Sequence, residues 1–112
     1  MTRLESNRKY WKTVNGKLMT TYNNMDRRVR GYTKPHLYSG LDICNRSDFY
    51  FWAKLDDEFT ELYDAWVESG YDRGLSPSID RMDSSKGYTF DNMQWLTQAE
   101  NSRNGAINRW KI

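Results

Sequence analysis

The sequence predicts an α+β fold, in which N-terminal helices pack on a small C-terminal unit of two strands and a helix. Apolar residues recur with helical spacing in two segments of the first 70 residues. Two short strand-like segments follow, and a motif typical of a helix start comes directly after the second. The 112 residues are the usual length of one domain. We therefore expect one domain over residues 1–112, mainly helical at 1–70, with the strand–strand–helix module at 76–105.

The first expected helix covers residues 4–30, with a candidate break at Asn15-Gly16. Gly31 occupies the position just beyond its end, where glycine is common. Apolar residues at steps of four, three and four form one helix face: Leu18, Tyr22, Met25 and Val29. Four basic residues lie mostly off that face, where they could contact phosphate: Lys17, Arg27, Arg28 and Arg30.

Two more helices are expected before residue 70. Residues 32–45 show little periodicity and predict a loop, with a candidate short strand at 41–43. Ser47 is the expected N-cap of a short helix. The next helix ends at Gly70 and follows the i, i+3, i+4, i+7, i+8 pattern: Phe59, Leu62, Tyr63, Trp66 and Val67. Three acids at its start suit the positive end of the helix dipole better than they indicate a metal cluster: Asp56, Asp57 and Glu58.

The C-terminal module has clear local signals. Short strands fit residues 78–82 and 93–96, and a long loop joins them. Thr97 and Glu100 form a capping box, in which the threonine oxygen accepts from the glutamate amide and the glutamate side chain reaches back. A helix should therefore begin at Gln98.

Composition excludes several classes of protein. Cys44 is the single cysteine, so an internal disulfide is excluded. One Cys and one His are too few for a Cys/His zinc site within one chain, so no zinc is expected. No apolar run approaches the roughly 20 residues of a membrane span, and the N-terminus has no apolar signal-peptide core. We expect a cytoplasmic protein without membrane contact.

The net charge of +2 hides an asymmetry along the chain. Residues 1–35 contain nine Lys and Arg against two acids, whereas residues 36–112 contain eight against thirteen acids. A basic arm of this kind favours binding to a polyanion. The alternative is that these basic residues form an ordinary solvated helix face.

Two polar residues of the module are candidate metal ligands. Asp80 lies at the end of the first strand, and Asn101 lies early in the last helix. In a strand–loop–strand–helix arrangement, two such side chains can meet across one hydrated ion. Their oxygen atoms suit Mg²⁺ or Mn²⁺, which take further ligands from water and phosphate. Asn104, one turn further on, competes with Asn101 for this role, and Asp80 and Asp83 could instead form local turn hydrogen bonds.

The stretch from Ser76 to Asn104 resembles the HNH endonuclease family, whose fold is a ββα-metal unit, and especially its phage-type branch. The positions that carry the resemblance are Asp80-Arg81-Met82-Asp83, Gly87-Tyr88, Asn92, Trp95, Thr97 and Asn101. The resemblance implies a metal-dependent endonuclease or nickase for double-stranded DNA, with Asp80 and Asn101 as ligands of Mg²⁺ or Mn²⁺. It also implies that Asn92 braces the loop and orients the catalytic base. Arg103 and the basic residues of the first helix would contact DNA.

Arg81 stands where the family has the histidine that acts as general base. A guanidinium with a pKa above about 12 cannot accept a proton at neutral pH, although it can bind phosphate through paired hydrogen bonds. Three explanations are open. His36 or Tyr88 is the base, or a metal-bound hydroxide or bulk water reacts at a reduced rate, or the module binds DNA without cutting it.

Three functions agree with these observations. The first is a phage-type, metal-dependent endonuclease or nickase, weakened by the loss of its base. The second is a non-catalytic DNA-binding module on the same scaffold. The third is a small phage protein that binds a host protein through its aromatic surface. The asymmetric charge favours the first two functions over the third. The missing histidine makes the non-catalytic module more plausible relative to the endonuclease. If phage-encoded, the protein would act in the host cytoplasm.

Overall fold

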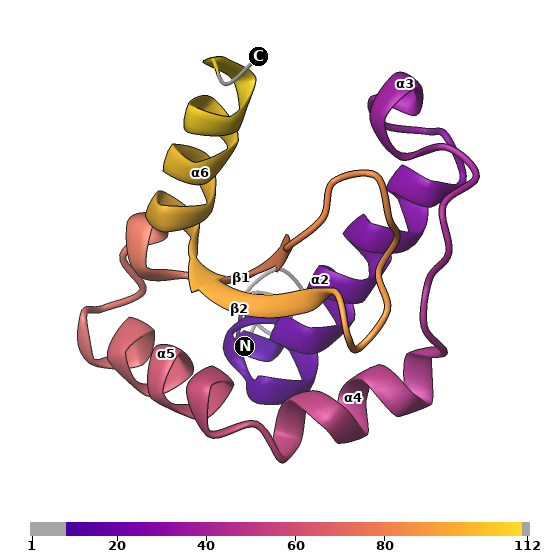
Figure 1. Ribbon diagram of the computed structural model, residues 1–112. Helices are drawn as coiled ribbons and strands as arrows, with labels where there is room; N and C mark the ends of the chain where they lie inside the picture. The colour runs from indigo at the N-terminus through magenta and orange to yellow at the C-terminus, as the bar shows by residue number, and fades with distance from the viewer. Residues whose placement is uncertain (1–8, 111–112) are drawn as a thin grey trace.

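Helices pack around a two-stranded antiparallel sheet, and a last helix follows the sheet directly (Figure 1). The computed structural model describes residues 9–110, with side chains described for residues 9–105. In chain order the elements are α2 (Val14–Val29), α3 (Pro35–Tyr38), α4 (Arg46–Lys54), α5 (Asp57–Glu68), the 3₁₀ helix η1 (Arg73–Leu75), β1 (Pro77–Arg81), β2 (Met93–Thr97) and α6 (Gln98–Trp110). The described residues thus combine helices and an antiparallel sheet, as the predicted α+β class requires.

An aromatic core joins the helices to the sheet. Trp95 of β2 is fully buried, and its ring centroid lies 4.5 Å from that of Phe59 in α5 and 6.0 Å from that of Phe49 in α4. Leu18 and Met25 of α2 belong to the same buried cluster. Because large aromatic side chains remove much apolar area from water, this cluster is the main source of stability. The expected position of Trp95 in the core is confirmed.

The start of α2 differs from its prediction. The helix is interrupted at Thr13, which is the N-cap of α2 and accepts a hydrogen bond from the Gly16 amide at 3.1 Å. Asn15 and Gly16 therefore lie inside the first turn, and the predicted break there is wrong. Gly16 is needed for a different reason, because a Cβ at this position would overlap the backbone of Tyr10. The predicted helix end is confirmed, with Val29 as the last residue and Gly31 at a φ of 87°.

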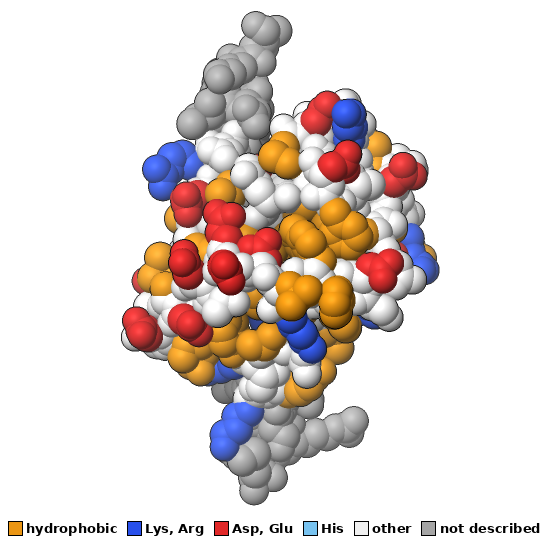
Figure 2. Space-filling model, turned by 60° about the horizontal axis from the view of Figure 1, so that its bottom comes forward, with side chains coloured by type: hydrophobic (Ala, Val, Ile, Leu, Met, Phe, Trp, Pro, Cys, Tyr) orange, Lys and Arg blue, Asp and Glu red, His pale blue; other side chains and the backbone are white. Residues whose placement is uncertain are grey.

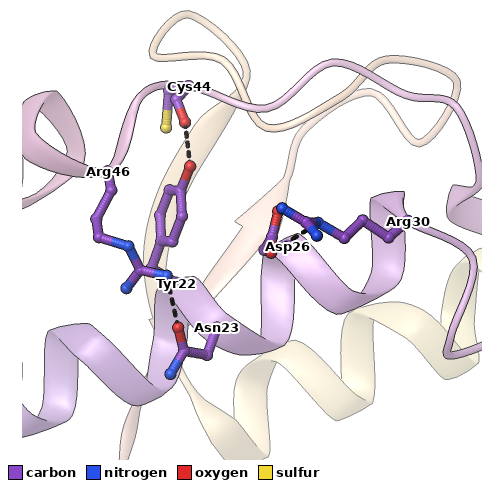
Figure 3. A network of polar contacts seen from close by, with 6 residues as sticks. All are labelled: Tyr22, Asn23, Asp26, Arg30, Cys44 and Arg46. Atoms are coloured by element: carbon purple, nitrogen blue, oxygen red, sulfur yellow. Dashed lines mark hydrogen bonds and ion pairs between the residues drawn. The ribbon is translucent and has the colours of Figure 1, made fainter.

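The segment between α2 and α4 contains more structure than expected. Pro35 opens the short helix α3, which has no apolar periodicity to reveal it. Within the candidate strand 41–43, only Ile43 forms a bridge, with Tyr88 of the loop after β1. The Tyr22 hydroxyl donates to the Cys44 carbonyl at 2.7 Å and ties this segment to α2 (Figure 3). The Cys44 thiol is half-buried, and this burial raises its pKa to about 11.

The N-cap predicted for α4 is wrong, whereas the interpretation of the acids at the start of α5 is correct. Asn45, not Ser47, is the N-cap of α4, and its side-chain oxygen accepts from the Ser47 amide at 2.9 Å. Asp56 is the N-cap of α5 and accepts from the Glu58 amide at 2.8 Å. The acids at the start of α5 are therefore explained by helix capping.

The C-terminal module follows its prediction closely. Strands β1 and β2 pair in antiparallel register, with Ile79 opposite Trp95. The capping box is confirmed, because the Thr97 hydroxyl accepts from the Glu100 amide at 3.1 Å and the Glu100 carboxylate accepts from the Thr97 amide and hydroxyl. Helix α6 begins at Gln98 as expected. Over the residues described, no helix has the length and apolar character to cross a membrane.

Candidate functional site

A polar cleft of about 510 Å³ lies between α3, α6 and the end of β1. In Figure 1, α3 and α6 rise on either side of the loop that joins the two strands. Asp80, Arg81 and Asn101 all line this cleft, together with Arg28 and Tyr88. Five of the residues singled out from the sequence thus line one cleft, and they come from α2, β1, the loop after β1 and α6.

Asp80 is half-buried at the end of β1. It pairs across the sheet with Gln94, whose side-chain amide donates to one carboxylate oxygen, Oδ2, at 2.8 Å. The second oxygen, Oδ1, has no hydrogen-bond partner within the described part of the chain. Asp80 is thereby fixed in orientation while one oxygen stays available to a ligand in the cleft.

Asn101 connects α6 to β1. Its side-chain nitrogen donates to the Ser78 hydroxyl at 2.6 Å and to the Ile79 carbonyl at 3.0 Å. Because a backbone carbonyl only accepts hydrogen bonds, the amide nitrogen must face the strand and the amide oxygen must point away from it. Asn104 does not line the cleft, so Asn101 is the better placed of the two asparagines to act as a ligand.

Arg81 braces the loop between the strands. Its Nη1 donates to the carbonyl oxygens of Ser84 and Lys86, each at 2.9 Å. Its guanidinium carbon lies 4.5 Å from the ring centroid of Tyr38 and 5.5 Å from that of Tyr88. The other guanidinium nitrogens, Nε and Nη2, have no such partner among the residues described. Arg81, at the position expected for a base, is therefore a cation that braces the loop. The edge of its guanidinium formed by Nε and Nη2 is left to bind an anion.

Replacing Arg81 by lysine should lower the free energy of unfolding by about 1–2 kcal/mol, because a single ammonium does not reproduce two carbonyl contacts and the stacking on tyrosine. Urea denaturation measures this change. Arg103→Lys is the matched control, since Arg103 is exposed on α6 and its replacement should leave stability within about 0.5 kcal/mol. Equal losses in the two variants would show that Arg81 does not brace the loop.

Asn92 closes the same loop from inside. Its side chain is 4% exposed. Its oxygen accepts from the Asp83 amide at 2.8 Å, and its nitrogen donates to the carbonyls of Asp83 and Gly87 at 3.0 and 2.9 Å. Asp83 itself is exposed, and hydrogen bonds from Ser85 lower the pKa of its carboxyl group. Asn92 thus holds the loop that Arg81 braces and that carries Tyr88 at the cleft, while Asp83 stabilises a turn.

The two candidate replacements for the base have unsuitable surroundings. His36 is exposed on α3 and is not one of the residues that line the cleft. Tyr88 is buried, which raises the pKa of its phenol, and its oxygen accepts from Nη1 of Arg28 at 3.1 Å. The Tyr88 phenol therefore stays protonated at neutral pH and acts as a donor rather than as a base.

The basic residues of α2 fall into different environments. Arg28 is half-buried and lines both the cleft and an adjoining cavity of about 130 Å³, which also reaches Asn101. Arg30 is paired with Asp26 at 3.0 Å (Figure 3), and Arg27 is exposed. The sequence pattern does not separate Arg28 from its neighbours, because Arg28 and Arg30 both lie next to the apolar position Val29.

Lys17 points into the protein rather than to solvent. Its ammonium donates to the Ser76 hydroxyl at 2.5 Å and lies 5.1 Å from the ring centroid of Trp66. Burial lowers the pKa of this amine. Lys17 is thus half-buried and lines the smaller cavity beside the cleft, and its expected contact with phosphate stays a prediction.

The donor atoms in the cleft fit a hydrated hard cation. Asp80 provides one carboxylate oxygen and Asn101 one amide oxygen, both without partners among the described residues. No group of three or more His, Cys, Asp and Glu side chains in that part of the chain is arranged to hold a metal. A divalent ion held by these two oxygens would take its other ligands from water and phosphate, as Mg²⁺ and Mn²⁺ commonly do.

Comparisons with protein families, with curated proteins and with solved structures gave no match for this chain.

Proposed function

We propose that this protein is a divalent-metal-dependent DNA endonuclease or nickase of low turnover, with its site in the cleft between α3, α6 and β1. The observation that carries this proposal is that Asp80 and Asn101 line the same cleft as Arg28 and Arg81. The two side-chain oxygens can be ligands of a cation, and the two guanidinium groups can donate hydrogen bonds to a phosphodiester at the same cleft.

Each residue has a defined role in this proposal. Asp80 and Asn101 would hold Mg²⁺ or Mn²⁺, and the ion would offset negative charge that develops on the phosphate. Arg28 and the open edge of Arg81 would bind phosphate oxygens. The Tyr88 oxygen accepts from Arg28, so its own hydrogen is available to donate to a phosphate oxygen.

The low turnover follows from the missing base. A positioned general base typically contributes about 10²–10⁴-fold to a rate, and neither His36 nor Tyr88 is suited to that role. The same observation favours a second candidate, a DNA-binding module that does not cleave. In that case Arg28 would still contact phosphate in the cleft, and Arg81 would only stabilise the loop.

Incubation with supercoiled plasmid separates the two candidates. The nuclease should convert the plasmid to open circles in Mg²⁺ or Mn²⁺ and not in EDTA, and Asn101→Ala should slow this conversion. DNA binding without nicking in either metal would establish the second candidate instead. Absence of both binding and nicking would rule out both.

DNA binding should depend strongly on salt, and Arg28 should contribute more than Arg30. Log K falls with log salt by about 0.9 for each phosphate that is neutralised, so Arg28→Gln should reduce the slope by about that amount. Arg30→Gln is the matched control, because Arg30 is already paired with Asp26 and should change the slope much less. Fluorescence anisotropy with a labelled duplex over a range of salt measures both. A slope that is unchanged in Arg28→Gln would place the phosphate contacts elsewhere.

A further inference from the structure

Helix α4 is apolar on two opposite faces. Phe49 and Ala53 are buried in the core. Phe51 and Leu55, which are also four positions apart, lie on the other side with 69% and 68% of their surface exposed. An ordinary surface helix has one apolar face and an opposite polar face, so the exposed apolar pair on the outer side of α4 has the character of an interface.

The exposed apolar side chains of α4 line a shared hollow and are not isolated on the surface. Phe51, Leu55, Trp52 and Phe90 line a hollow of about 470 Å³, which we call the α4 groove. The rings of Trp52 and Phe90 lie 5.5 Å apart, so the loop between the strands forms one wall and α4 forms the other. Figure 2 shows apolar side chains gathered on this face. Contiguous apolar surface of this kind marks interaction sites in soluble proteins.

Acidic side chains surround the α4 groove. Asp48 and Asp56 line it directly, and Figure 2 shows further acidic side chains beside the apolar ones. Residues 46–68 contain two bases, of which Arg46 donates to Asn23 and Tyr50. They also contain seven acids: Asp48, Asp56, Asp57, Glu58, Glu61, Asp64 and Glu68. The two carboxylates that line the groove oppose DNA there and favour a cationic partner.

We propose that the α4 groove binds an amphipathic helix of another protein, whose apolar face is flanked by Lys and Arg. An apolar groove of this shape suits side chains presented at i, i+3 or i+4 and i+7 by a helix. In a symmetric pair of copies the same groove with its two carboxylates would lie on both sides of the contact, so a basic partner complements its charge better than a second copy does. The partner that we propose is therefore a different, basic chain, and the groove is separate from the cleft between α3, α6 and β1.

Selection of peptides on the full-length protein tests this proposal. The probe is a phage-displayed library of random peptides of about four helical turns. We expect enriched sequences to carry apolar residues with helical spacing and Lys or Arg beside them. A synthetic peptide from this set should bind the Phe51→Ser/Leu55→Ser double variant about tenfold more weakly or worse, as is usual for central interface residues. Fluorescence anisotropy provides the affinities.

Two controls make the test specific. Tyr32 is 72% exposed in the turn after α2, and Tyr32→Ser should bind the peptide as the unmodified protein does. Asp48→Lys leaves the apolar residues and the Asp56 cap intact, and it should weaken binding, more so at low salt. Circular dichroism checks that each variant is folded.

Several results would overturn the proposal. These are no enrichment, enrichment of acidic or non-amphipathic sequences, equal binding by the double variant, or unchanged binding by Asp48→Lys. Sedimentation that shows a dimer of this chain, which Phe51→Ser/Leu55→Ser dissociates, would identify a second copy as the occupant and would equally exclude a basic partner.

Discussion

Asp80→Ala should abolish metal-dependent nicking, with a loss of about 100-fold or more. Asp80 is the one carboxylate among the described residues that line the cleft, so its removal takes away the charged ligand of the proposed ion. Stability should change little, within about 0.5 kcal/mol, because the side chain is half-buried and its one side-chain hydrogen bond comes from Gln94. The rate of conversion of supercoiled plasmid and a urea titration measure the two effects.

Two further variants show whether charge or shape is responsible. Asp80→Asn keeps the size of the side chain and can keep the contact with Gln94, but it removes the charge, so it should be nearly as inactive as Asp80→Ala. Asp83→Ala is the matched control, because Asp83 lies in the adjoining loop, outside the cleft lining, and should leave nicking nearly unchanged. Nicking by Asp80→Ala at the original rate would exclude Asp80 as a ligand, and an unfolded variant would indicate a structural role.

Asn92→Ala should lower the free energy of unfolding by about 3 kcal/mol. The side chain makes three hydrogen bonds within the loop, one buried and two partly buried. Each is worth about 1 kcal/mol, and the loss of the side chain leaves the Gly87 carbonyl without that partner. Asn92→Asp should be at least as unstable, because a carboxylate would face the carbonyl oxygens of Asp83 and Gly87. Urea denaturation gives these values.

The control for Asn92 is Asn24→Ala. Asn24 is exposed on α2, and alanine has the higher helix propensity, so stability should be equal or slightly greater. If Asn92→Asp were as stable as the unmodified protein, Asn92 would fill space rather than brace the loop. A loss in Asn92→Ala similar to that in Asn24→Ala would contradict the bracing role altogether.

The elements that could be predicted are those whose hydrogen bonds and apolar contacts are local. The capping box at Thr97 and the helix beginning after Asp56 depend on residues within a few positions of one another. The strands were predictable from their own short residue runs, although their pairing joins residues as far apart as Pro77 and Thr97. Ser47 was predicted as the N-cap of α4 where the structure has Asn45, because both residue types can cap a helix. Periodicity locates a helix end only to within a turn. Helix α3 has one turn, which is too short for an apolar pattern.

The candidate site was less predictable, because its contacts join distant parts of the chain. Arg28 reaches Tyr88 across 60 positions, and Lys17 reaches Ser76 across 59. No local pattern shows that one basic residue of a helix turns inward while its neighbour pairs with an acid. The bracing contacts of Arg81 are close in sequence, but they depend on a loop conformation that Asn92 holds from inside.

The bridge between Ile43 and Tyr88 has a consequence for how the C-terminal module can be used. The Tyr88 carbonyl accepts from the Cys44 amide, and the Tyr88 amide donates to the Asp42 carbonyl, each at 2.8 Å. Trp95 is covered by rings from α4 and α5. A fragment that begins after α5 would therefore leave these backbone groups and this indole uncovered. We therefore expect that the module formed by β1, β2 and α6 does not fold when it is moved alone into another protein. It would need a packing surface equivalent to the one that residues 42–68 provide.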